Sequence, residues 1–74
     1  MLVVPDYRGF RLQIDAIAAD GADDRWNADV RIRRNLSKAK PHVERVTCTK
    51  LTPEHAERRA AIWARRWVDV ISDP

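Results

Sequence analysis

The sequence predicts a two-layer α+β fold, β-β-β-α in element order, in which one C-terminal helix packs on one face of a three-stranded antiparallel meander sheet. In the first two thirds of the chain apolar and polar residues alternate with a period of two, which is typical of strands with one buried face. In the last third apolar residues recur at helical spacing. Because only one helix is available, it must cover the apolar face of the sheet. A chain of 74 residues has room for one core, so we expect residues 1–74 to form a single domain.

Three segments are predicted to be strands, at about 7–18, 25–34 and 42–51. The second has the clearest pattern, because every other residue from Trp26 to Ile32 is apolar. In the third, Val43 and Val46 would point to opposite faces, which a β-bulge would reconcile. Asp20-Gly21 predicts a turn between the first two strands, because glycine tolerates a positive φ and aspartate can hydrogen-bond its own turn.

Thr52-Pro53-Glu54 predicts the start of a helix over about 53–71. Threonine can cap the free amides, proline suits the first helical position, and a glutamate there faces the positive end of the helix dipole. Ile62 falls on the polar side of this helix, between Arg58 and Arg65, where a monomer would expose it. Seven apolar residues gather on one side and are expected to face the sheet: Ala56, Ala60, Trp63, Ala64, Trp67, Val70 and Ile71.

Several classes of protein are excluded by composition. Cys48 is the only cysteine, so no internal disulfide is possible, and no stretch approaches the ~18 apolar residues of a membrane span. Charges interrupt the apolar start of the chain, so we expect no signal peptide and a cytoplasmic location. Neither a nucleophile–base pair nor a metal-ligand spacing emerges from Cys48, His42 and His55. We therefore expect a non-enzymatic protein with no metal, cofactor or small-molecule substrate.

The net charge of +3 is unevenly distributed along the chain. Residues 1–30 hold three Arg against six Asp, whereas residues 31–45 hold six Lys and Arg against one Glu. Clustered cations bind phosphate backbones, because binding releases condensed counterions. The alternation places Arg11 and Gln13 on the same outward face as Arg31 and Arg33, although a charged face can equally be a solvated one that deters aggregation. The candidate nucleic-acid contacts are Arg31, Arg33, Arg34, Lys38, Lys40 and Arg45.

A second hypothesis is a homo-oligomeric interaction module without nucleic-acid binding. A three-stranded sheet has two free edges and one uncovered face, which a second copy related by a two-fold axis would cover. The acidic segment 1–30 of one copy would then meet the basic segment 31–45 of the other. In this interpretation the interaction surface contains Ile62, Arg58 and Arg65.

Short motifs in the chain resemble a known family. These are Tyr7-x-Gly9, Arg25-Trp26-x-Ala28-x-Val30-x-Ile32 and Thr52-Pro53-Glu54-x-Ala56 followed by Trp67-x-Asp69, and they resemble a small, mainly β-proteobacterial family, a domain of unknown function, over about residues 7–71. The resemblance implies the order of the elements and little chemistry. That order is also similar to the sheet–helix half of double-stranded-RNA-binding domains and to HicB-type antitoxins. The RNA-binding family has lysines where this helix begins with Glu54 and Glu57, so its contacts are carried over to no position here.

Overall fold

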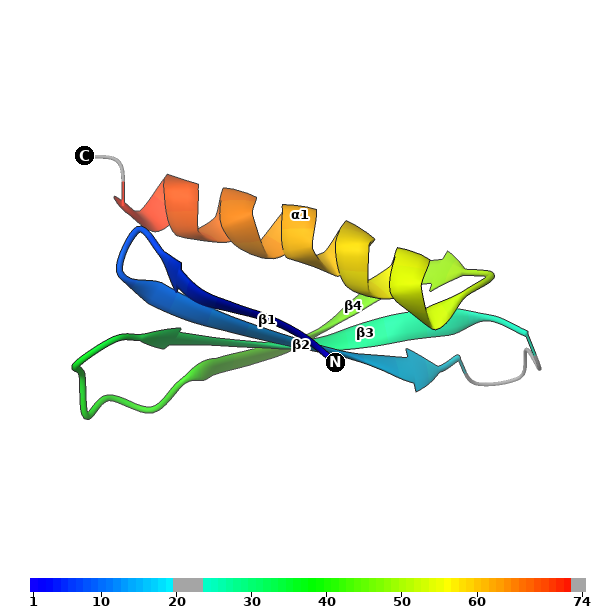
Figure 1. Cartoon of the computed structure of the whole chain (residues 1–74), viewed down its shortest axis with the longest axis horizontal. Coiled ribbons are helices and arrows are strands. Elements are labelled where there is room, and N and C mark those ends of the chain that lie inside the picture. Colours follow the sequence, from blue (N-terminus) through cyan, green and yellow to red (C-terminus); the bar gives the residue numbers. More distant parts are fainter. Residues whose placement is uncertain (20–23, 73–74) are drawn as a thin grey trace.

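The computed structural model describes residues 1–19 and 24–72 and shows an antiparallel sheet covered on one face by a C-terminal helix (Figure 1). The predicted α+β class is confirmed. The strands lie in the order β1-β2-β3-β4, and every neighbouring pair is antiparallel. The turn predicted at Asp20-Gly21 lies outside the described residues, which end at residue 19 and resume at residue 24. Along the chain the elements are β1 (Leu2–Tyr7), β2 (Phe10–Ala18), β3 (Trp26–Arg34), β4 (His42–Lys50) and α1 (Pro53–Ser72).

The predicted number of strands is wrong, because the sheet has four strands and not three. The segment predicted as one strand at about 7–18 contains the end of β1 and all of β2, joined by a tight turn at Arg8-Gly9. Leu2–Val4 of β1 pairs with Leu12–Ile14 of β2. Both turn residues have positive φ, which glycine adopts at little cost. β1 contains Pro5, which cannot donate a hydrogen bond to a neighbouring strand and is therefore not typical of a strand inside a sheet. It is tolerated here because β1 is an edge strand.

The core lies between α1 and the inner faces of β2 and β3. These two strands pair over nine consecutive residues without a register shift, so their alternate side chains form a continuous apolar face. β4 contributes no buried residue, because α1 covers mainly the two middle strands. The buried apolar residues are Phe10, Leu12, Ile14, Ala28, Val30 and Ile32 from the sheet and Ala56, Ala60, Ala61, Ala64 and Val68 from the helix.

The buried side of α1 is rotated relative to the prediction. Val68 is fully buried, whereas Val70 and Ile71, which were expected to face the sheet, are 76% and 48% exposed. Trp63 and Trp67 are only partly buried and pack at the side of the core. The reason is steric: a stripe of alanines lets the helix approach the sheet closely, and the bulky indoles are accommodated beside the stripe.

The C-terminal end of β4 departs from regular pairing and leads into α1. Ala28 pairs with Val46 but Trp26 pairs with Lys50, so β4 contains two extra residues between these pairs. This irregularity follows Val46, so it does not reconcile Val43 with Val46 as expected: the two valines stay on opposite faces, Val43 exposed and Val46 against the core. At the irregularity the Thr49 amide donates to Asn27 Oδ1 at 3.0 Å. After β4 the helix begins as the Thr-Pro-Glu pattern predicts, with Thr52 Oγ1 accepting a hydrogen bond from the amide of the third helical residue at 3.2 Å.

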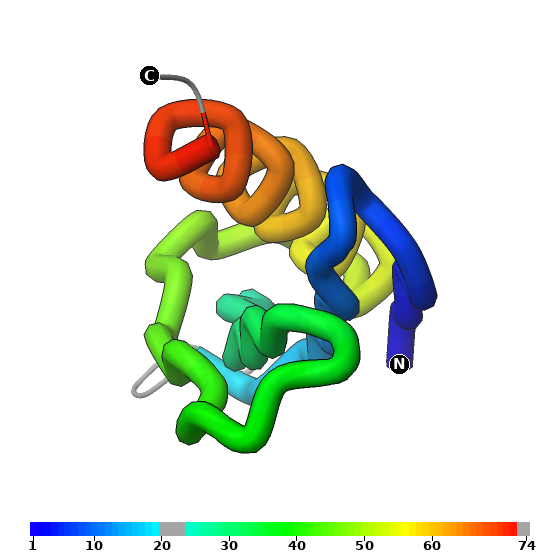
Figure 2. Tube along the Cα trace, turned by 90° about the vertical axis from the view of Figure 1, so that its left-hand side faces the viewer, coloured from blue at the N-terminus to red at the C-terminus, as the bar shows by residue number. Residues whose placement is uncertain are grey.

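Viewed at right angles to Figure 1, the helix lies on one side of the curved sheet, and the β3–β4 loop, residues 35–41, lies on the opposite side (Figure 2). The outer face of the sheet is therefore bordered by this loop and not by the helix. Among the described residues, no helix combines the length and the apolar character required to cross a bilayer.

Candidate nucleic-acid interface

Three arginines gather on the outer face of the sheet, which α1 leaves uncovered. The register of β2 and β3 places Arg11 directly opposite Arg33, and Gln13 directly opposite Arg31. Neighbouring strands are ~4.8 Å apart and alternate residues of a strand ~6.6 Å apart, so the three guanidinium groups share one small area. All three arginines are exposed. We refer to Arg11, Arg31 and Arg33 as the arginine cluster.

The arginine cluster lines an open pocket of about 340 Å³ together with Gln13 and Pro41. No carboxylate lines this pocket. In the described part of the chain none of the three guanidinium groups forms an ion pair. Like charges directly opposite each other on a sheet are destabilising, so an anion bound at this position would relieve their repulsion.

The next row of the outer face is partly neutralised. Asp15 lies opposite Asp29, and Arg45 Nε donates to Asp29 Oδ1 at 2.9 Å. Arg45, one of the predicted contacts, is thus committed to an ion pair beside the cluster. The two aspartates bound the basic surface on this side, because they would repel a phosphate group.

Arg34, another predicted contact, lies apart from the arginine cluster. It is opposite Phe10 in the register, on the side of the sheet that carries the core, and its guanidinium carbon is 5.1 Å from the centre of the Phe10 ring. This geometry is a cation–π contact. Lys38 and Lys40 are exposed. They belong to the β3–β4 loop, residues 35–41, which lies on the side of the sheet away from α1 (Figure 2).

The structure therefore brings together only part of the predicted set. Arg31 and Arg33 belong to the cluster, Lys38 and Lys40 lie in the loop that supplies Pro41 to its pocket, and Arg34 and Arg45 contact other groups. Arg11 was not among the predicted contacts, because it lies outside the basic block 31–45. The alternation of apolar and polar residues in β2 does indicate Arg11, because it places Arg11 on the same face as Arg31 and Arg33 of β3.

The residues of the second hypothesis are neighbours on the exposed side of α1, but of the three only Ile62 lines the groove beside β4. Ile62 is 42% exposed and lines a groove beside β4 with Arg59 and Arg66. The Arg65 side chain extends toward β1, where its guanidinium carbon is 6.0 Å from the centre of the Tyr7 ring. Arg58 is exposed and is not among the residues lining the groove.

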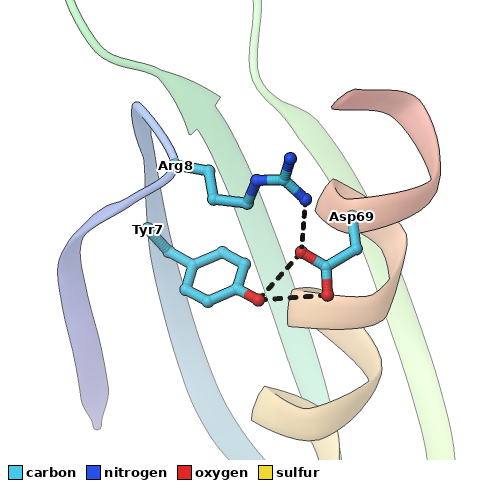
Figure 3. A network of polar contacts seen from close by, with 3 residues as sticks. All are labelled: Tyr7, Arg8 and Asp69. Atoms are coloured by element: carbon cyan, nitrogen blue, oxygen red, sulfur yellow. Dashed lines mark hydrogen bonds and ion pairs between the residues drawn. The ribbon is translucent and has the colours of Figure 1, made fainter. Parts of the chain in front are cut away.

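Asp69 ties the end of α1 to the β1–β2 turn (Figure 3). Tyr7 Oη donates to Asp69 Oδ1 at 2.8 Å, and Arg8 Nη1 donates to the same oxygen at 3.0 Å. The hydrogen bonds from Arg8 and Tyr7 hold the pKa of Asp69 below its usual 3.8. The hydrogen bond to Asp69 is also the main reason why the pKa of Tyr7 lies above 10.0. These contacts join residues more than sixty positions apart and so link the β1–β2 turn to the last turns of α1.

Asp69→Asn is expected to destabilise the protein at neutral pH and to have little effect in strong acid. Because the pKa of Asp69 is lower in the folded than in the unfolded chain, its contribution is present above 3.8 and is lost as the pH falls below that value. The raised pKa of Tyr7 acts oppositely, since its contribution is lost as the pH rises past 10.0. Thermal melts of both proteins, followed by circular dichroism, measure this. A difference in Tm that stays constant from neutral pH into strong acid would contradict the assignment.

The described residues place no three side chains of His, Cys, Asp or Glu where they could hold a metal ion. Cys48 is half-buried, with its Sγ 3.8 Å from the carbonyl oxygens of Trp26 and Ala56. His42 stacks on Trp67, with the ring centres 4.6 Å apart. Both side chains contact the helix side of the sheet and not the arginine cluster.

Comparison of the chain with protein-family models, with curated proteins and with solved structures gives no significant match. The resemblance to the β-proteobacterial family therefore stays a prediction.

Proposed function

We propose that this protein binds nucleic acid electrostatically through the outer face of its sheet. The arginine cluster would contact the phosphate backbone, and Lys38 and Lys40 would extend the contact along the β3–β4 loop. The observation that supports this is the meeting of three guanidinium groups, without carboxylate partners in the described chain, on a face that no helix covers. Guanidinium groups bind phosphate with paired hydrogen bonds, and each phosphate neutralised releases counterions.

The surface is better suited to a duplex backbone than to unpaired bases. Proteins that bind single strands stack bases on exposed aromatic rings. Here Trp63 and Trp67 pack against the core on the opposite side of the sheet, and the Tyr7 hydroxyl is bonded to Asp69. Contacts to phosphate position a protein without specifying a sequence, so we expect binding with little base preference.

Arg33→Glu tests this proposal by reversing one charge of the arginine cluster. Fluorescence anisotropy with short DNA and RNA duplexes is expected to show saturable binding that weakens with added salt. The substitution is expected to lower the affinity about tenfold and to reduce the dependence on salt, because phosphate contacts are lost. Arg58→Glu is the matched control, since it makes the same change in net charge at an exposed position on the helix.

Two results would contradict the proposal. One is the absence of saturable, salt-sensitive binding by the unsubstituted protein. The other is an equal loss of affinity in Arg33→Glu and Arg58→Glu, which would show a dependence on net charge alone and not on the outer face.

Self-association is the second candidate function, and the exposure of Ile62, Val70 and Ile71 on α1 favours it. A two-fold contact centred on Ile62 would, however, bring Arg59 and Arg66 of one copy against the same residues of the other. Their repulsion is the reason for preferring nucleic-acid binding. Sedimentation velocity distinguishes the two, because a dimer that Ile62→Asp dissociates would favour self-association.

A further inference from the structure

A groove between β4 and α1 lies on the helix side of the sheet, away from the arginine cluster. Its volume is about 380 Å³. Val46 of β4 and Ile62 and Trp63 of α1 give it an apolar surface. The remaining lining residues are Thr47, Cys48, Lys50, Arg59 and Arg66.

The groove exists because α1 covers the middle of the sheet better than its β4 edge. No residue of β4 is buried, whereas β2 and β3 each contribute three residues to the buried core. Trp63 is only partly buried, and Ile62 is 42% exposed. A partner that filled the groove would remove this apolar surface from water, which is favourable.

The free edge of β4 runs alongside the groove. In the described sheet β4 pairs only with β3, so one row of its backbone N–H and C=O groups has no strand beside it. The opposite edge, β1, is shorter and is interrupted by Pro5 and by an irregular register, features that protect an edge against pairing. β4 has no proline, and its register with β3 is regular from His42 to Val46. A peptide can therefore pair with this stretch, and the irregularity between Val46 and Lys50 limits the pairing to it. Extended peptides bind such edges by adding a strand.

The charge around the groove identifies the chemistry of the partner. Lys50, Arg59 and Arg66 are exposed, and none of them forms an ion pair within the described chain. No carboxylate lines the groove, and Glu44, the acidic residue of β4, lies 3.6 Å from His42 Nε2. A second copy of the chain would bring like charges together, whereas an acidic segment would neutralise them.

We propose that β4 and this groove bind an extended acidic segment of a partner protein. The segment adds to the sheet as a fifth strand beside β4. One apolar side chain enters the groove next to Trp63, and carboxylates on either side of it meet Lys50, Arg59 and Arg66. This site is independent of the arginine cluster, which lies on the other face of the sheet.

The probe for this site is the peptide acetyl-Thr-Glu-Thr-Leu-Thr-Glu-Thr-amide. As a strand it presents its leucine and both glutamates on one face, because alternate side chains share a face. Titration is expected to give a saturable change in tryptophan fluorescence, since Trp63 lines the groove. Arg59→Glu is expected to weaken binding about tenfold, while Arg33→Glu, on the other face, leaves it unchanged. A peptide with lysines in place of the glutamates is expected not to bind.

Backbone N-methylation separates strand addition from simple charge attraction. One peptide is methylated at the threonines that flank leucine, and another at leucine and the glutamates. Amides of a strand point alternately to its two edges, so only one of these peptides is expected to lose binding.

The proposal is overturned if the acidic peptide gives no saturable change, if the lysine peptide binds equally well, or if Arg59→Glu has no effect. Equal binding by both methylated peptides would overturn the fifth strand. If the acidic peptide fails, a dimer in sedimentation velocity would identify a second copy as the occupant. If Arg59→Glu instead weakens the binding of a nucleic-acid duplex, the occupant of the groove is nucleic acid. Because Arg33→Glu tests the outer face separately, failure here leaves the proposed function standing.

Discussion

Ile14→Ala is expected to lower the free energy of unfolding by about 2–5 kcal/mol. Ile14 is fully buried in the middle of β2, opposite Val30, and faces the helix. Removing its side chain loses burial and leaves a cavity that the surrounding residues fill only in part. The loss is a large fraction of the ~4–11 kcal/mol expected for a domain of this length.

Urea denaturation followed by tryptophan fluorescence and circular dichroism measures the effect of Ile14→Ala. Val43→Ala is the control, since Val43 is 59% exposed on β4, and we expect it to change stability by no more than about 0.5 kcal/mol. Equal effects of the two substitutions would mean that the core does not lie between α1 and β2.

Ala60→Leu is expected to destabilise the protein by about 1–3 kcal/mol or more, although it adds apolar surface. Ala60 is fully buried in the alanine stripe of α1, together with Ala56 and Ala64. The helix lies close to the sheet because these side chains are small, so a leucine must displace either the helix or the strands beneath it.

The same denaturation experiment measures Ala60→Leu against Arg58→Leu. Arg58 lies on the exposed side of the same helix, so its replacement introduces a leucine without overpacking the core. We expect Arg58→Leu to change stability by less than about 0.5 kcal/mol. Unchanged or increased stability in Ala60→Leu would show that α1 packs more loosely than described.

β3 and the start of α1 could be predicted from the sequence, because their patterns of residues are strong. β1 and the buried side of α1 could not. Apolar and polar residues alternate without a break along β3, and the Thr-Pro-Glu pattern marks the start of α1. β1 was missed because it is an edge strand that contains Pro5, and no residue of it is buried. The buried side of α1 was misplaced because Trp63 and Trp67 were expected to occupy its centre. In the structure the centre of the buried side is occupied by alanines, whose small size lets the helix pack close to the sheet. This is a property of tertiary packing and is not visible in helical spacing.

The arginine cluster, too, could be predicted from the sequence only in part. Alternation alone predicts which arginines of β3 face away from the helix. It does not predict which residues of β2 lie opposite them, because cross-strand register depends on the length and geometry of the connecting turn. That register places Arg11 opposite Arg33, Arg34 opposite Phe10, and Asp29 opposite Arg45. The first creates the arginine cluster, and the other two bring Arg34 and Arg45 to different partners.

Amide NMR spectra of isotope-labelled protein, recorded as a short nucleic-acid duplex is added, locate the binding surface residue by residue. The largest shift changes are expected in the arginine cluster, in Gln13 and in the β3–β4 loop, and they should diminish as salt is added. Amides around the groove of β4 and α1 are expected to change little. Spectra that do not change, or changes centred on α1 with an unaffected outer face, would contradict the account.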